Sequence, residues 1–170
     1  MNLVETIANE HSKAQCDKIV KYIGCDRSRF AQLVKVFLSG PYRITQRAAW
    51  PLSYCVEMHP ELVRPHLRMI IQNLKKPGLH NAVKRNTVRL LQYIAIPKSL
   101  QGTLATVCFE MFQNPKEPIA LRIFSMTVLA GIAQDQSELK NELRILIEDQ
   151  LPYASAGFLN RARKVLKQLQ

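Results

Sequence analysis

Arginine and aromatic side chains recur at helical spacing between residues 43 and 57. At about 100° per residue, the residues that share one narrow sector of a helix are Arg43, Arg47, Trp50 and Tyr54. Arginine donates paired hydrogen bonds to carboxylate or phosphate groups. Aromatic rings anchor protein partners or stack on nucleic-acid bases. This face therefore has the chemistry of a binding surface for an anionic partner.

More cations follow at an equivalent place further along the chain. Arg85 stands 38 residues after Arg47, and Lys84 and Arg89 flank it. The predicted partner-binding residues are Arg43, Arg47, Trp50, Tyr54, Lys84, Arg85 and Arg89. A second interpretation stays open, because a guanidinium can also cap backbone carbonyls or pair with an acid on a neighbouring helix. A tryptophan and a tyrosine at helical spacing can equally pack between helices.

The sequence contains none of the common catalytic signatures. It has no H-E-x-x-H, no G-x-S-x-G, no P-loop and no G-x-G-x-x-G. Its acids lie at expected helix caps or on solvated faces, as Asp17, Asp26, Asp135 and Asp149 do. The 4 cysteines form no C-x-x-C pair and have no histidine at zinc-ligand spacing. We expect a non-enzymatic binding protein with reduced thiols, no metal, no cofactor and no small-molecule substrate.

The charge of the chain favours anionic partners. Its net charge is +11, with 8 Lys/Arg against 2 Asp/Glu in residues 51–100. Residues 101–150 are acidic, with 4 against 7, and the last twenty residues carry 4 Lys/Arg and no acid. Such a field attracts acidic proteins or polyanions, although it also serves solubility. The first hypothesis is an acidic or phosphorylated protein partner. The second is nucleic acid, bound through its backbone without sequence preference.

The elements that must position these residues form an internal repeat. Four segments align without gaps, and each has an arginine at its second position: Arg47, Arg85, Arg122 and Arg161. These arginines are 38, 37 and 39 residues apart, and a second amphipathic segment lies between successive copies. A period near 40 with two helices per unit is typical of an α-solenoid. We expect an all-α chain of eight or nine helices in about four hairpins, forming a single domain over residues 1–170.

Capping and breaking residues predict where the helices begin and end. Ser12 with Gln15 begins a helix that Gly24 ends, and Asp26 caps the next. The following helix spans about residues 43–57 and continues through Pro51, which should bend it. We then expect helices over about 60–74, 81–94, 97–113 and 119–133. Asp135 with Glu138 should cap the next helix, and Pro152 and Gly157 should separate it from a basic terminal helix.

One segment resembles a known family most closely. QRAAWPLSYCVEMHPELVRPHL, which begins at Gln46, is similar to a HEAT repeat with a proline in its first helix. The resemblance extends over about residues 12–169 and implies a right-handed α-α superhelix of the HEAT or armadillo type. The chain also resembles short bacterial HEAT-like proteins, some of which carry an adenylosuccinate lyase label. The residues do not support that label, because the lyase loop Gly-Ser-Ser-x-Met-Pro-x-Lys-x-Asn-Pro is missing.

A second resemblance, to HEAT-type alkylpurine DNA glycosylases, lies in architecture and charge. No aspartate of this chain matches a catalytic one, so the resemblance implies DNA binding at most. The first residues lack the basic and apolar regions of a signal peptide, and the longest apolar runs are shorter than a membrane span. We therefore expect a cytoplasmic protein, monomeric in solution and not bound to a membrane.

Overall fold

The computed structural model describes the backbone of residues 1–170 and every side chain except that of Asp135. The described chain contains ten α-helices, three short 3-10 helices and no strand. The α-helices are α1 (Leu3–Asn9), α2 (Lys13–Ile23), α3 (Arg27–Ser39), α4 (Tyr42–Met58), α5 (Leu67–Leu74), α6 (Asn81–Leu91), α7 (Lys98–Gln113), α8 (Ile119–Ile132), α9 (Ser137–Gln150) and α10 (Ala156–Gln168). The 3-10 helices are η1 (Pro60–His66), η2 (Ala133–Asp135) and η3 (Leu151–Tyr153). The predicted all-α solenoid is confirmed, with one or two helices more than expected.

The chain divides into two compact units, Met1–Ile94 and Ala95–Gln170. The first unit contains α1 to α6 and all the predicted partner-binding residues. The second contains α7 to α10. The single domain over residues 1–170 stays a prediction.

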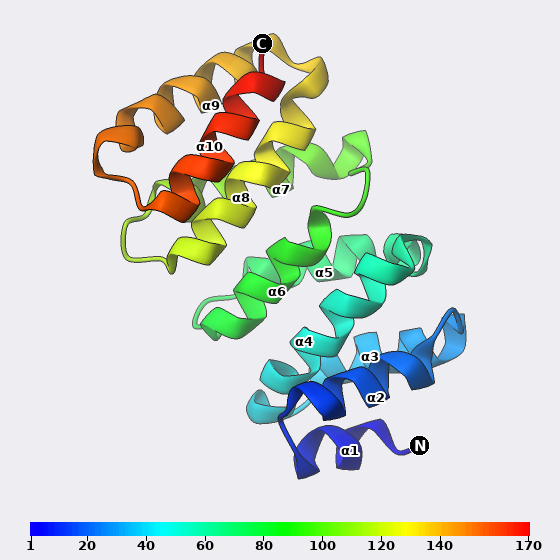
Figure 1. The fold of residues 1–170 in the computed structure, drawn as a ribbon. Coiled ribbons are helices and arrows are strands. Elements are labelled where there is room, and N and C mark those ends of the chain that lie inside the picture. Colours follow the sequence, from blue (N-terminus) through cyan, green and yellow to red (C-terminus); the bar gives the residue numbers. More distant parts are fainter. The chain divides into compact units, whose positions relative to one another are not determined.

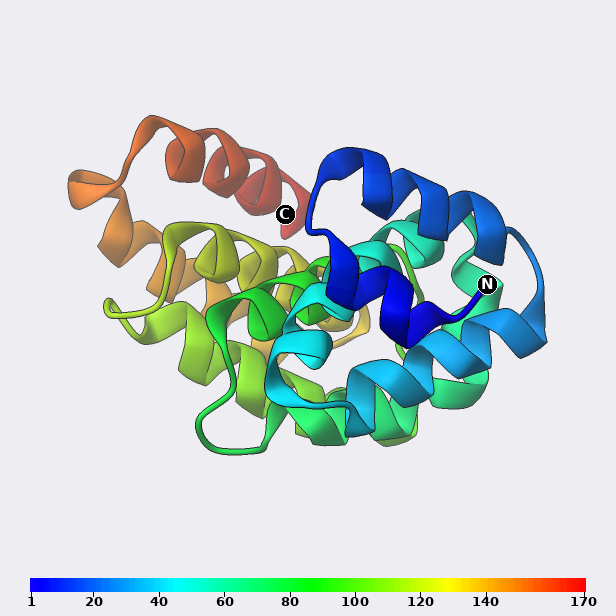
Figure 2. The same cartoon turned by 90° about the horizontal axis from the view of Figure 1, so that it is seen from below.

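In the first unit, α4 is the central helix. It packs against α1, α2, α3 and α6, so that α2, α4 and α6 form one layer. In the view of Figure 1, α3 and α5 lie behind this layer, and Figure 2 shows the same elements turned by 90°. The core between the layers includes the fully buried side chains of Phe30, Phe37, Leu52, Ile70 and Ile71. A helix held on several sides presents its remaining face in a fixed orientation, which is a requirement for a binding surface.

The predicted caps in the first unit are confirmed. The Oγ of Ser12 accepts from the Gln15 amide at 3.1 Å, and the Oδ1 of Asp26 accepts from the Arg29 amide at 3.0 Å. Gly24 ends α2 at a φ of 50°, a conformation that costs glycine little. The Gln15 side chain does not close a capping box. It donates instead to the carbonyl of Thr6 at 2.5 Å and so connects α2 to α1.

The helix with Pro51 continues through it, as expected. Its apolar face, with Ala48, Leu52 and Cys55, is buried on both sides of the proline. Pro51 has no N–H, so the carbonyl of Arg47 receives no hydrogen bond from it. The bend at this position stays a prediction.

Three predicted boundaries were wrong. The expected helix over 60–74 is divided into η1 and α5, because Pro65 lies inside η1 and its ring excludes a regular α-helical turn. The helix over 81–94 ends at Leu91. Gly157 does not break the chain but lies in the first turn of α10, whose cap is the Oγ of Ser155. The predicted cap by Asp135 lies outside the described side chains; α9 has Gln136 at its N-cap position.

The second unit is organised around α8, the most apolar helix in the sequence. It packs against α7, α9 and α10, and it spans Ile119–Ile132, close to the predicted 119–133. Phe112 of α7 and Phe158 of α10 stack with ring centroids 6.1 Å apart and planes inclined by 7°. Arg122 lies at the edge of this core, where it donates from Nε to the carbonyl of Phe112 at 3.1 Å.

Candidate functional site

The side chain of Arg47 is hydrogen-bonded within the first unit. Its Nη1 donates to the carbonyl of Ala8 at 2.6 Å and to that of Ile7 at 3.2 Å. These carbonyls belong to the last turn of α1, where backbone acceptors have no helical partner and a positive charge is favourable. Arg47 therefore caps α1, which is the second of the two interpretations that its spacing left open.

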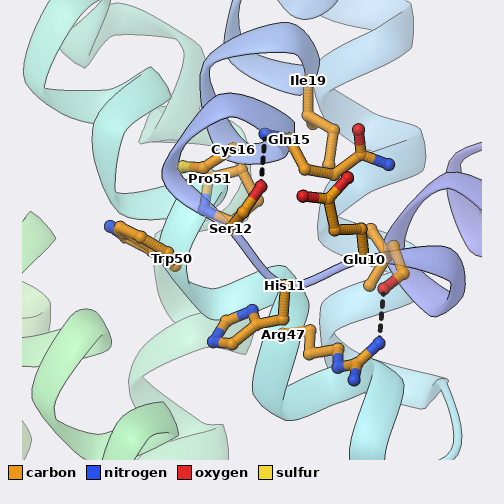
Figure 3. A pocket seen from close by; sticks show the side chains of 10 residues that line it. Glu10, His11, Ser12, Gln15, Cys16, Ile19, Arg47, Trp50 and Pro51 are labelled. Atoms are coloured by element: carbon orange, nitrogen blue, oxygen red, sulfur yellow. Dashed lines mark hydrogen bonds between the residues drawn. The ribbon is translucent and has the colours of Figure 1, made fainter.

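Trp50 is half-buried and holds the turn between α1 and α2. Its ring makes an edge contact with His11, with centroids 5.4 Å apart and planes inclined by 69°. It also lies 6.4 Å from the ring of Tyr54, one turn further along α4. Figure 3 shows His11, Arg47 and Trp50 around the hollow beside α2. Part of the Trp50 ring stays open to solvent, so this residue both packs and presents an aromatic surface.

Tyr54 lies between two cations from the neighbouring helices. The Nζ of Lys13 on α2 is 4.7 Å from the centre of its ring, and the guanidinium carbon of Arg89 on α6 is 4.6 Å from it. Both distances allow a cation–π attraction. We call Lys13, Tyr54 and Arg89 the cation–aromatic ladder. It crosses the layer of α2, α4 and α6 and fixes these three side chains relative to one another.

Arg89 has partners on each side of its guanidinium. Its Nη1 donates to the buried Oγ of Ser53 at 2.5 Å, and its Nη2 donates to Oε2 of Glu57 at 2.5 Å. The Arg89 side chain is 19% exposed and that of Glu57 is 36% exposed. Its carbon CZ also lies 5.5 Å from the centre of the Tyr93 ring. Arg89 therefore joins α6 to α4 and cannot turn towards a partner without breaking these bonds.

Arg43 and Arg85 differ from the other two arginines. Both are exposed, and neither guanidinium has a hydrogen-bond or ion-pair partner in the described part of the chain. Arg43 lies in the first turn of α4, and Arg85 lies in the middle of α6. Lys84 precedes Arg85 and is half-buried. The two arginines are thus the predicted site residues that face solvent with unused donors.

The hollow beside Trp50 is too small for an organic ligand. It is lined by Ile7, Glu10, His11, Ser12, Gln15, Cys16, Ile19, Arg47, Trp50 and Pro51. The volume that the centre of a water molecule can occupy inside it is about 10 Å³, so the hollow has room for one water. Burial raises the pKa of the Cys16 thiol in its wall to about 11, so this sulfur is not a nucleophile at neutral pH. Burial, and then the charge of Arg47, lower the pKa of His11.

Lys13 and Ser53 are members of the site that the sequence did not indicate. Lys13 also pairs with Asp17 one turn along α2. No sequence signal could have identified Lys13, because its contact with Tyr54 depends on how α2 crosses α4. Ser53 is a buried hydroxyl between apolar neighbours, and a buried polar residue in an apolar run does signal a partner nearby.

Neither a metal centre nor a membrane span is found among the described residues. No three His, Cys, Asp or Glu side chains there come close enough to hold a metal ion. No described helix is both long and apolar enough to cross a bilayer.

The comparisons with known proteins agree with the fold. A family model described as a HEAT repeat domain matches residues 3–169. The match includes both units and all the predicted site residues. None of the curated proteins with which the sequence was compared matches it. HEAT repeat domains are helical-repeat scaffolds for protein interactions.

Proposed function

The chain belongs to the HEAT repeat family, and from this premise we propose that it is a non-enzymatic interaction module for an acidic or phosphorylated protein. The proposed surface is the outward face of α4 and α6. The observation that carries the proposal is the cation–aromatic ladder, which fixes Tyr54 between Lys13 and Arg89 next to the half-exposed Trp50. Tryptophan, tyrosine and arginine are the residues that most often dominate the energy of protein interfaces.

The predicted residues would have different roles in binding. Arg43 and Arg85, which have unused donors, would contact carboxylate or phosphate groups directly, and Lys84 directly precedes Arg85 in the sequence. Trp50 would supply the apolar anchor. Arg47 and Arg89 would act by holding the surface, since both are bonded within the first unit. A surface fixed before binding loses less side-chain entropy when the partner arrives.

Charge supports the choice of an acidic partner. The first unit carries 15 Lys/Arg and 6 Asp/Glu, whereas the second carries 9 and 7. Three of the six acids in the first unit are already paired, Asp17 with Lys13, Asp26 with Arg29 and Glu57 with Arg89. The remaining positive field would speed the encounter with an acidic protein and disfavour basic ones.

The proposal includes the absence of catalysis, a monomeric state and a cytoplasmic location, which stay predictions. The family supports the first of these, since its members are generally scaffolds without enzyme activity. Steady turnover of a substrate, abolished by substitution of one Asp, Glu or His residue, would contradict it.

Affinity capture followed by reconstitution tests the proposed surface. Wild-type protein and the Arg43→Glu/Arg85→Glu variant are immobilised, and proteins retained only by the wild type are identified by mass spectrometry. Each candidate is then purified and titrated by calorimetry. We expect Trp50→Ala and the double variant each to weaken binding about tenfold or more. The control is Lys18→Glu/Lys21→Glu on α2, which changes the charge equally at two exposed positions. Equal loss in the control would show that net charge, and not this surface, determines binding.

A further inference from the structure

Two turns of the first unit meet at one edge. Tyr42 begins α4 and His80 precedes α6, and their rings make an edge contact with centroids 5.9 Å apart and planes inclined by 80°. Figure 1 shows the start of α4 and the turn before α6 on the same side of this unit. Lys75 and Lys76 lie in that turn, within five residues of His80. We call Tyr42, Arg43, Lys75, Lys76 and His80 the turn edge.

The turn edge is built from segments of the chain that carry no acid. Residues 27–56 and 62–109 contain no Asp or Glu, and these two segments supply every residue of the edge. Arg43, Lys75 and Lys76 are exposed, and none of the three pairs with an acid in the described chain. A run of cations without interspersed acids favours a ligand that carries several negative charges at regular spacing.

The turn edge also contains an exposed aromatic ring. Tyr42, which directly precedes Arg43, is 64% exposed and makes the edge contact with His80. Exposed aromatic rings beside a positive surface are the platform on which unpaired bases stack. Two of the three cations here are lysines, which act as point charges towards a phosphate backbone.

We propose that the turn edge binds single-stranded nucleic acid. Backbone phosphates lie on Arg43, Lys75 and Lys76, and an unpaired base stacks on Tyr42. These contacts are to backbone phosphates and to the face of one base, so binding is independent of sequence. The site shares only Arg43 with the proposed protein-binding surface, and the variants below leave that surface unchanged.

Fluorescence anisotropy of a labelled oligothymidylate tests the proposal directly. Three phosphate contacts on a single strand predict a log–log salt dependence with a slope of about −2. We expect Lys75→Glu/Lys76→Glu to weaken binding about tenfold or more, and Tyr42→Ala to weaken it about fivefold or more at constant charge. Lys18→Glu/Lys21→Glu, with the same change in charge on α2, should change affinity by less than about twofold.

Two further probes decide between ligand classes. A duplex of equal length should bind more weakly, because its bases are not free to stack, and labelled poly-glutamate should be insensitive to Tyr42→Ala. Poly-glutamate that binds as tightly as the oligonucleotide would overturn the proposal in favour of an acidic protein. Absence of oligonucleotide binding at low salt, or equal loss in the α2 control, would also overturn it. The protein-binding proposal is tested separately, by Trp50→Ala and Arg43→Glu/Arg85→Glu against a protein partner.

Discussion

Arg89 of α6 bridges two residues of α4 that lie one turn apart, Ser53 and Glu57. The two hydrogen bonds have acceptors with different access to water. Ser53 is fully buried, so its hydroxyl oxygen has no access to water and depends on Arg89 for a donor. Glu57 is partly exposed, so on folding its carboxylate exchanges a hydrogen bond with water for one with the guanidinium. The same guanidinium also lies over Tyr54, so one side chain fixes both the spacing of α4 and α6 and the orientation of the candidate aromatic surface.

Replacement of Arg89 should therefore destabilise the first unit. Arg89→Met keeps much of the apolar stem but leaves the Ser53 oxygen without its donor and Glu57 without its pair. We expect a loss of about 1–2 kcal/mol in the free energy of unfolding, reduced from the range for buried charged hydrogen bonds because Glu57 is partly exposed. Urea denaturation measures it. In a double-mutant cycle with Ser53→Ala, the two losses should not add, because the alanine removes the oxygen that Arg89 satisfies. Additive losses would mean that the bond contributes nothing.

Arg47 should stabilise α1 specifically. Arg47→Ala removes the donor for the carbonyls of Ile7 and Ala8, and we expect a cost of about 1 kcal/mol, confined to the seven-residue α1. Hydrogen exchange should accelerate in α1 and remain unchanged in α3. The matched control is Arg85→Ala, whose guanidinium has no hydrogen-bond partner in the described structure and whose exchange pattern should be that of the wild type. Unchanged exchange of α1 in the Arg47 variant would contradict the capping role.

These two arginines also explain how far the sequence could predict this protein. The 38-residue spacing identified Arg47 and Arg85 as equivalent positions, and the repeat and its fold are confirmed. Periodicity reports which helical face a residue occupies, and that is enough to predict the layers. It does not report what lies opposite that face. Arg47 meets α1, whose presence over α4 depends on how a short and weakly patterned segment packs, whereas Arg85 meets solvent.

The same limit applies to the boundaries and to the aromatic residues. Local signals act within a few residues, so Ser12, Gly24 and Asp26 gave correct ends for α2 and α3. The conversion of residues 60–66 into a 3-10 helix was missed, although Pro65 carried the signal. Trp50 and Tyr54 were assigned to the correct face, but their contacts with His11 and Lys13 come from α2 and its preceding turn. Contacts of that kind depend on helix crossing angles, which a single sequence does not encode in any short pattern.

The stability of the first unit should fall in mild acid. Burial, and then Arg47, lower the pKa of His11 from its ordinary value of 6.5, and burial lowers that of His66. The unfolded chain therefore binds protons first as the pH falls, and folding loses stability from about pH 6.5 downwards until the folded pKa values are passed. Above that range both states are neutral and the effect is absent.

Thermal unfolding at a series of pH values between 5 and 8 measures this dependence. We expect the melting temperature to decrease below about pH 6.5, and His11→Gln to remove part of the slope, because glutamine does not titrate. His59→Gln serves as the control, since it replaces a histidine elsewhere in the same unit. A slope that His11→Gln leaves unchanged would show that His11 does not contribute to it.

Only one of the 4 cysteines should react rapidly in the native protein. Cys25 follows the end of α2 and is exposed, whereas Cys16, Cys55 and Cys108 are buried. Burial also raises the pKa of these three thiols to about 11, 12 and 12, so few of them are thiolates in the folded protein at neutral pH. Titration with Ellman's reagent at pH 8 should give one fast equivalent in buffer and four in guanidinium chloride. Cys25→Ser should abolish the fast phase, while Cys16→Ser should retain it. A second fast equivalent that disappears in Cys16→Ser would show that α2 separates readily from α4 and would contradict this prediction.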